Sequence, residues 1–172
     1  MKRYIPTMYR KSIFDISYSK LKKRGIKCLI FDLDNTLALI DEKKCPEKTK
    51  QLCERLKKEF QVVIISNNTK KRLLPYLEEL QVDGVSMAMK PGIRGLKKIQ
   101  KKYRLHKEEM VMIGDQLMTD IVSGNRFQIM TILVDPLGKK DLKITGINRF
   151  FENRVLKKLS QLKILERGTY YE

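Results

Sequence analysis

A short apolar run that ends in two carboxylates is the feature that most constrains this sequence. Residues 27–37 begin with an apolar run typical of a buried strand, which leads directly into Asp32, Asp34 and Thr36. In open α/β sheets, ligands bind at the carboxyl ends of the strands. The pattern therefore predicts that these polar residues stand on a tight loop at one edge of a sheet. The alternative is an acidic turn in which Asp34 or Asn35 only caps a helix.

The succession of apolar strand, polar end and helix recurs along the chain. Further strands are predicted at 61–65, 82–87, 110–113 and 129–134, and helices at 45–60, 69–80 and 93–103. Strands separated by helices indicate a parallel sheet with right-handed crossovers. The sequence thus predicts an α/β protein with a Rossmann-like parallel sheet of about five strands flanked by helices.

Polar residues at the strand ends are expected to converge, because parallel strands share one carboxyl edge. They are Asp32, Asp34, Thr36, Ser66, Asn67, Lys90, Asp115 and Asp120. Carboxylates suit Mg²⁺, which binds one or two of them together with phosphate oxygens. A hydroxyl and an ammonium can stabilise the other oxygens of a transferring phosphoryl group, and a carboxylate can attack phosphorus to give an aspartyl phosphate. The set therefore predicts phosphoryl transfer.

Four of these segments, in this order, resemble the motifs of the haloacid dehalogenase (HAD) superfamily. The likeness covers residues 27–134 and rests on Asp32-Leu33-Asp34-Asn35-Thr36, Ser66, Lys90, and Gly114-Asp115 with Asp120. The second Asp of the first motif is typical of the phosphatase branch. Within that branch the chain is most similar to the subclass IIIA phosphatases called YqeG-like, which are related to the mitochondrial phosphatidylglycerophosphate phosphatase. The resemblance implies a HAD-like fold and a Mg²⁺-dependent phosphatase.

The resemblance also implies roles for the residues that carry it. Asp32 would be the nucleophile, and Asp34 the general acid and then the general base, so Asp34 has to begin the reaction protonated. Ser66 and Lys90 would bind the phosphoryl group, and Asn67 is a further candidate for substrate binding.

Metal binding is implied for three of the same residues. Asp32, the backbone carbonyl of Asp34, and Asp115 would hold Mg²⁺, while Asp120 would orient Lys90 or a metal-bound water. Thr36 would brace the loop. Structural alternatives stay open for five residues, because Ser66, Asn67, Asn68 and Thr119 could be helix caps and Lys90 could be a solvated turn residue.

Spacing bears on the size of the substrate. There are 29 residues between Thr36 and Ser66 and 23 between Ser66 and Lys90, and a predicted helix and strand fill each interval. We therefore expect no cap domain, which in relatives of this superfamily closes over small substrates. An uncapped site is open to solvent and suits a phosphate carried on a lipid head group, a protein or a nucleic acid end.

The charge of the chain is strongly positive. With 37 Lys and Arg against 20 Asp and Glu, the net charge is +17, which favours nucleic acid, anionic lipid or phosphorylated substrates as partners. Basic residues are dense in segments 1–26 and 137–172. The first is predicted to contain an amphipathic helix, and the second a helix with the apolar stripe Phe151, Val155, Leu159 and Leu162.

Both terminal segments are expected to pack on the core at 27–136, so that residues 1–172 form a single domain; contact with an anionic membrane surface is the alternative. The three cysteines match no metal or disulfide spacing, which indicates reduced thiols and a cytoplasmic protein. Neither a secretory signal nor a membrane span is predicted, and peripheral attachment at the inner face of the membrane stays open.

The sequence therefore predicts a Mg²⁺-dependent phosphomonoester hydrolase that acts through an aspartyl phosphate. By resemblance, its candidate substrate is phosphatidylglycerophosphate. Two alternatives remain: a phosphatase of small soluble or nucleotide phosphates, and a basic RNA-binding or ribosome-binding protein on a HAD scaffold. Nucleic-acid binding would weaken steeply with salt.

Overall fold

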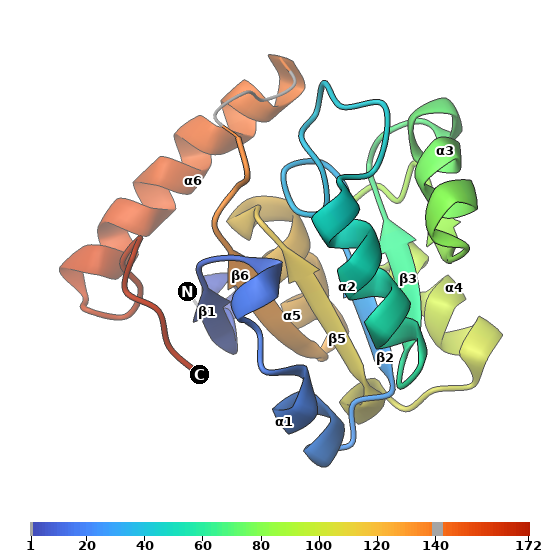
Figure 1. Ribbon diagram of the computed structural model, residues 1–172. Coiled ribbons are helices and arrows are strands. Elements are labelled where there is room, and N and C mark those ends of the chain that lie inside the picture. The colour runs from blue at the N-terminus through green and yellow to red at the C-terminus, as the bar shows by residue number, and fades with distance from the viewer. Residues whose placement is uncertain (1, 139–142) are drawn as a thin grey trace.

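The computed structural model, which describes residues 2–138 and 143–172 and only the backbone of 143–151, centres on a six-stranded parallel sheet (Figure 1). The strand order is β1-β6-β5-β2-β3-β4. The strands are β1 (Met8–Arg10), β2 (Cys28–Phe31), β3 (Gln61–Ile65), β4 (Asp83–Val85), β5 (Met110–Gly114) and β6 (Met130–Val134). The expected Rossmann-like α/β fold is confirmed, with one strand more than predicted.

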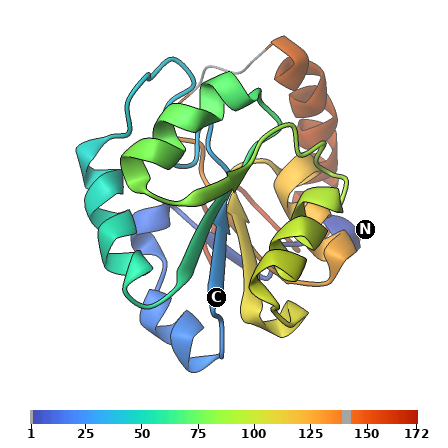
Figure 2. The ribbon, with the colours of Figure 1, turned by 90° about the vertical axis from the view of Figure 1, so that its right-hand side faces the viewer.

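Both faces of the sheet are buried, because successive side chains of each strand point to opposite faces. In β2, Leu29 and Phe31 belong to one hydrophobic cluster, and Cys28 and Ile30 to another. Helices cover each cluster and form the two outer layers seen in Figure 2. The first face is covered by α1 (Tyr18–Lys23), α2 (Glu47–Lys57) and α3 (Lys70–Leu80), and the second by α4 (Arg94–Tyr103) and α5 (Val122–Phe127).

The amino-terminal segment differs from the prediction of one amphipathic helix. It forms the short turns η1 (Lys2–Tyr4) and η2 (Ile13–Asp15), the edge strand β1 and the six-residue α1. The apolar residues that suggested a helix, such as Ile13 and Leu21, are buried in the core. β1 pairs with β6, Met8 opposite Ile132, and its Tyr9 exchanges two backbone hydrogen bonds with Tyr171. Long-range pairing therefore overrides the local helical pattern here.

The carboxyl-terminal segment forms α6 (Lys143–Gln161), which lies beside β1 in Figure 1. Leu159 is fully buried and packs with Leu156, Tyr9 and Leu133. The predicted stripe is wrong for Leu162, which lies beyond the last helical turn and is 54% exposed. The side chain of Phe151, also in that stripe, lies outside the described residues.

The order of the strands fixes where a ligand can bind. The chain leaves β2 for β3 and β4 on one side and returns through β5 and β6 on the other. This reversal between β2 and β5 is the place where open α/β sheets bind ligands. Phe31 lies opposite Ile113, so the residues that follow β2 and β5 meet at the same edge. Among the described helices, none is both long and apolar enough to span a bilayer.

Candidate active site

The loop after β2 holds its first carboxylate against the neighbouring strand. The backbone N–H of Asp32 donates to the carbonyl of Ile113 at 2.9 Å, so Asp32 is fixed beside the end of β5. The chain then turns at Asn35, whose φ of 63° is left-handed and is tolerated by asparagine better than by most residues. The Asn35 N–H donates to the carbonyl of Ala38 at 2.7 Å, which closes the turn. Asp32 and Asp34 are both buried.

The segment after β5 brings in two more carboxylates. Asp115 follows the strand directly, and the π-helical turn η4 (Leu117–Ile121) carries Asp120 back toward it. The carboxylate of Asp120 accepts from the N–H of Gln116 at 3.1 Å. A Cβ on Gly114 would lie 2.2 Å from Oδ2 of Asp120, so glycine is required for this approach. Such π-turns are frequent at functional sites.

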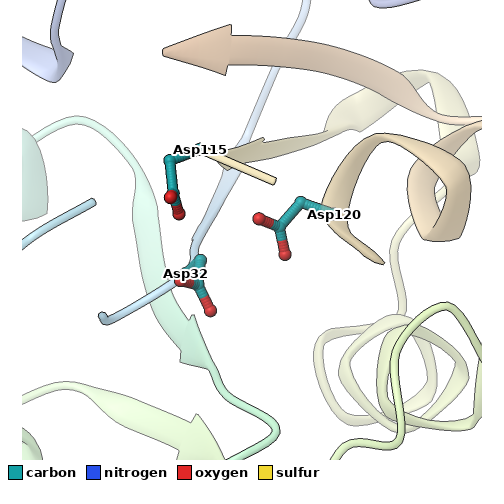
Figure 3. A group of neighbouring side chains, drawn as sticks. All are labelled: Asp32, Asp115 and Asp120. Carbon is teal, nitrogen blue, oxygen red and sulfur yellow. The ribbon is translucent and has the colours of Figure 1, made fainter. Parts of the chain in front are cut away.

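Asp32, Asp115 and Asp120 form a buried group of carboxylates (Figure 3). One oxygen from each lies within 4.8 Å of the others. Buried carboxylates at this separation repel one another, and a divalent cation would relieve that repulsion. Hard oxygen donors are the ligands that Mg²⁺ prefers, so the donor set fits this ion. Thr36 adds support, because its hydroxyl donates to Oδ1 of Asp115 at 3.1 Å.

Lys90 joins two of these carboxylates. Its Nζ donates to Asp32 Oδ1 at 2.5 Å and to Asp120 Oδ1 at 2.6 Å, and also to the carbonyl of Ile65. The residue is only 6% exposed. The alternative that Lys90 is a solvated turn residue is therefore wrong.

Asn67 engages the backbone of Lys90. Its Nδ2 donates to the Lys90 carbonyl at 2.9 Å, and its Oδ1 accepts from the Lys90 N–H at 2.6 Å. This paired contact uses both ends of the amide to position Lys90. The residue that caps α3 is Thr69, whose side chain accepts from the N–H of Arg72, so Asn67 is not its cap.

Ser66 follows β3 at the same edge and is buried. Its Oγ accepts from the N–H of Asn68 at 3.0 Å, a contact within the turn that precedes α3. Because Thr69 caps α3, Ser66 is not the cap of that helix. A hydroxyl that accepts still carries a proton to donate. Thr119 is also buried, and its hydroxyl donates to Gln116 Oε1 at 3.1 Å.

Burial dominates the electrostatics of this site. Burial raises the pKa of Asp32 to about 7; the ammonium of Lys90 opposes the rise, and the charge of Asp120 adds to it. For Lys90, burial alone would lower the pKa, but the charges of Asp120 and Asp32 outweigh it and the pKa is raised. Lys90 therefore stays protonated, whereas Asp32 takes up a proton near neutral pH when no metal is bound.

The structure adds Arg72, which sequence reasoning missed. Its Nε and one of its terminal nitrogens donate to Asp34 Oδ1 at 3.0 and 2.8 Å. The guanidinium also donates to the carbonyls of Leu39 and Glu42, so α3 is tied to the loop after β2. The carboxylate of Asp34, which is expected to act as acid and base, is therefore held in an ion pair with Arg72. In the sequence, Arg72 follows two lysines and has the pattern of a solvated basic turn.

The fold is shared with a solved phosphatase. The cobalt-bound form of the deoxy-D-mannose-octulosonate 8-phosphate phosphatase from Haemophilus influenzae matches with a TM-score of 0.52 at 16% identity, over 79% of this chain and 90% of that one. The expected HAD-like fold is thereby confirmed. This fold, the carboxylates at its strand ends and the sequence relatives define a phosphatase of the HAD type.

Within that class, the chain belongs to the family described as mitochondrial PGP phosphatase, whose model matches residues 1–138. "Probable phosphatase YqeG" of Bacillus subtilis (strain 168) is 37% identical over 161 residues, which cover 93% of this chain and 94% of that protein. The chloroplastic/mitochondrial phosphatidylglycerophosphate phosphatase 1 of Arabidopsis thaliana is 28% identical over 152 residues. That match covers 80% of this chain but 42% of the plant protein, so the chain spans less than half of this relative.

Proposed function

We propose that this protein hydrolyses phosphatidylglycerophosphate with Mg²⁺, through an aspartyl phosphate formed on Asp32. The observation that carries the proposal is the buried ammonium of Lys90, 2.5 Å from Asp32 and 2.6 Å from Asp120. A nucleophile and a phosphate-binding cation are thus held together at the reversal point of the sheet. Preorganised charge of this kind stabilises the transition state of phosphoryl transfer.

In the first step, Asp32 attacks phosphorus and the bond to the leaving oxygen breaks. Asp34 gives a proton to that oxygen, while the Ser66 hydroxyl and the Lys90 ammonium donate hydrogen bonds to the transferring group. Asp34 then accepts a proton from the attacking water, which releases phosphate and restores Asp32. When bound by Asp32, Asp115 and the Asp34 carbonyl, Mg²⁺ supplies positive charge that offsets the charge of the phosphoryl oxygens.

Asp120 and Thr36 position the reacting groups of the site. Asp120 accepts from Lys90 and so orients the ammonium, and Thr36 donates to Asp115. Asn67 holds the backbone of Lys90 in place. We therefore assign these three residues to positioning, and the chemistry to Asp32, Asp34, Ser66 and Lys90.

The short intervals on either side of Ser66 support a large substrate. The interval from Thr36 to Ser66 forms α2 and β3, and the interval from Ser66 to Lys90 forms α3 and β4. Each is thus one helix and one strand, as a site without an inserted cap requires. The plant relative is named for phosphatidylglycerophosphate, a substrate that resides in a bilayer. We place the protein in the cytoplasm at the inner face of the membrane, with residues 1–172 as one domain.

A turnover panel tests this function. Phosphate release is measured with Mg²⁺ from phosphatidylglycerophosphate in mixed micelles, and from a nucleotide, a sugar phosphate and a phosphopeptide. We expect the phospholipid to be the best substrate and Asp32→Asn, which keeps an acceptor for Lys90, to be inactive. Preference for a soluble phosphate would contradict the proposed substrate. Hydrolysis of none of the four, with tight salt-sensitive RNA binding, would favour the binding protein instead.

A further inference from the structure

Two exposed methionines stand at the same edge of the sheet as the site. Met87 and Met89 lie in the loop between β4 and α4 and are 67% and 73% exposed. Lys90 follows Met89 directly, yet its side chain is buried on Asp32. Exposed apolar side chains beside a functional site are typical of interaction surfaces. Methionine is common on such surfaces because its side chain adapts to irregular partners.

The backbone of this loop turns both methionines outward. Met87 and Met89 have φ of 47° and 54°, a left-handed conformation that is strained for residues other than glycine. Ala88 between them is buried, and its N–H donates to the Ser66 carbonyl at 3.0 Å. The N–H of Met87 donates to the carbonyl of Asn68 at 2.9 Å. The strained loop therefore holds the two apolar side chains out of the described hydrophobic clusters.

Exposed basic residues lie on the segments that adjoin this loop. The loop is joined by hydrogen bonds to the turn that precedes α3, whose first two residues are lysines, and α4 begins with an arginine. Another exposed arginine, Arg126, donates to the carbonyl of Pro91 at 3.2 Å. We call this surface the methionine rim, and it comprises Lys70, Lys71, Met87, Met89, Arg94 and Arg126. Apolar tips with flanking basic residues are typical of segments that lie on anionic bilayers.

We propose that the methionine rim docks this protein on an anionic bilayer. Met87 and Met89 enter the boundary between head groups and acyl chains, and the cations of the rim face lipid phosphates. Docking in this orientation sets Lys90 at the level of the head groups, so a lipid phosphate reaches the site without leaving the membrane. The inference rests on the proposed function, since it names the surface from which the substrate comes.

The residue types favour lipid over nucleic acid as the partner. Proteins bind single-stranded nucleic acid by stacking bases on aromatic side chains. Among the described residues, the exposed aromatic side chain is Tyr170, which contacts Tyr9 of β1. β1 and β4 are the two opposite edges of the sheet, so Tyr170 is remote from the rim. The rim itself offers methionines and cations.

Tryptophan fluorescence tests insertion directly, because the chain contains no tryptophan. Met89→Trp places a single probe on the rim, and Leu162→Trp places one at an exposed site near the opposite edge of the sheet. With vesicles of phosphatidylcholine and phosphatidylglycerol, we expect the emission of Met89→Trp to shift to the blue and to be quenched by brominated acyl chains. Leu162→Trp is expected to change little. Equal quenching of both probes, or of neither, would overturn the proposal.

A second variant measures the contribution of the rim to binding. Met87→Asn with Met89→Asn removes the apolar tips but suits the left-handed backbone, so folding is not put at risk. We expect affinity for the same vesicles to fall by about tenfold or more. Leu162→Asn is the matched control and is expected to bind as the wild type does. Unchanged vesicle binding by the double variant, or loss of RNA binding in place of vesicle binding, would contradict the inference.

The proposed function is tested separately. Hydrolysis of the soluble substrate p-nitrophenyl phosphate by the wild-type protein needs no vesicle, and vesicle binding by Asp32→Asn needs no turnover. If the protein hydrolyses neither p-nitrophenyl phosphate nor phosphatidylglycerophosphate in mixed micelles, but its vesicle binding depends on the two methionines, the proposed function is wrong and the docking surface is supported. Normal hydrolysis together with vesicle binding that does not depend on Met87 and Met89 would support the proposed function and contradict the docking surface.

Discussion

Lys90 organises the site at the scale of single residues. Its ammonium is buried between Asp32 and Asp120, and its backbone is held by Asn67. A buried ion pair is seldom a net source of stability, because each charge loses its hydration. We therefore interpret the ion pairs of Lys90 as preorganisation of the site. In the proposed mechanism they hold a cation where the phosphoryl group binds.

Protonation of Asp32 gives a test of metal binding. Burial raises the pKa of Asp32 to about 7, so the group is mostly protonated below that pH and mostly ionised above it. Because a metal ligand must be deprotonated, Mg²⁺ binding is expected to release more protons at about pH 6 than at about pH 8. Calorimetry in two buffers of different ionisation enthalpy measures the number released.

The matched control for proton release is Asp32→Asn, which cannot ionise. We expect this variant to show no dependence of proton release on pH. Equal release by the wild-type protein at both pH values would contradict the assignment of Asp32 as a ligand.

Arg72 gives a second prediction at this scale, on stability. Arg72→Met removes the cation that pairs with the buried carboxylate of Asp34 and is expected to lower the free energy of unfolding by about 3–5 kcal/mol. Adding Asp34→Asn removes the unpaired charge, so the double variant is expected to be more stable than Arg72→Met alone. Denaturant unfolding of the wild type, Arg72→Met, Asp34→Asn and the double variant completes a double-mutant cycle. Additive effects of the two changes would mean that the ion pair contributes little.

At the scale of elements, the sequence predicted five of the six strands and missed β1. Residues 61–65 were predicted as a strand and form β3. β1 has only three residues, too few to display alternation, and its partner β6 lies far along the chain. The convergence of the strand ends followed from parallel topology alone. The contact of Arg72 with Asp34 did not, because it depends on how α3 packs over the loop.

Packing of the carboxyl-terminal helix leads to a third prediction. Leu159 of α6 is fully buried among residues of β1, β6 and η4, whereas Leu162 is 54% exposed. Leu159→Ala is expected to destabilise the fold by about 2–5 kcal/mol through the cavity that it leaves. The matched Leu162→Ala is expected to stay within about 0.5 kcal/mol of the wild type. Thermal or urea unfolding compares them; a similar loss in both would contradict the described packing.

At the scale of the whole molecule, a strongly basic chain encloses an acidic site. The chain carries a net charge of +17, yet the reversal point of the sheet gathers three buried carboxylates. The sequence could predict this acidic centre because strand order places it, and it could predict the positive balance. It could not predict which surface the cations occupy, because that depends on loops such as the one that carries Met87 and Met89.

The proposed phosphoryl transfer requires Asp32 to act as the nucleophile within this centre. The most direct measurement is to quench the protein during turnover of p-nitrophenyl phosphate with Mg²⁺, reduce with borohydride and locate the modified residue by mass spectrometry. We expect an acyl phosphate on Asp32 to be trapped as homoserine at that position, and no modification in Asp32→Asn. Turnover without any trapped residue, or modification at Asp34 or Asp115 in place of Asp32, would contradict the role of Asp32 as nucleophile.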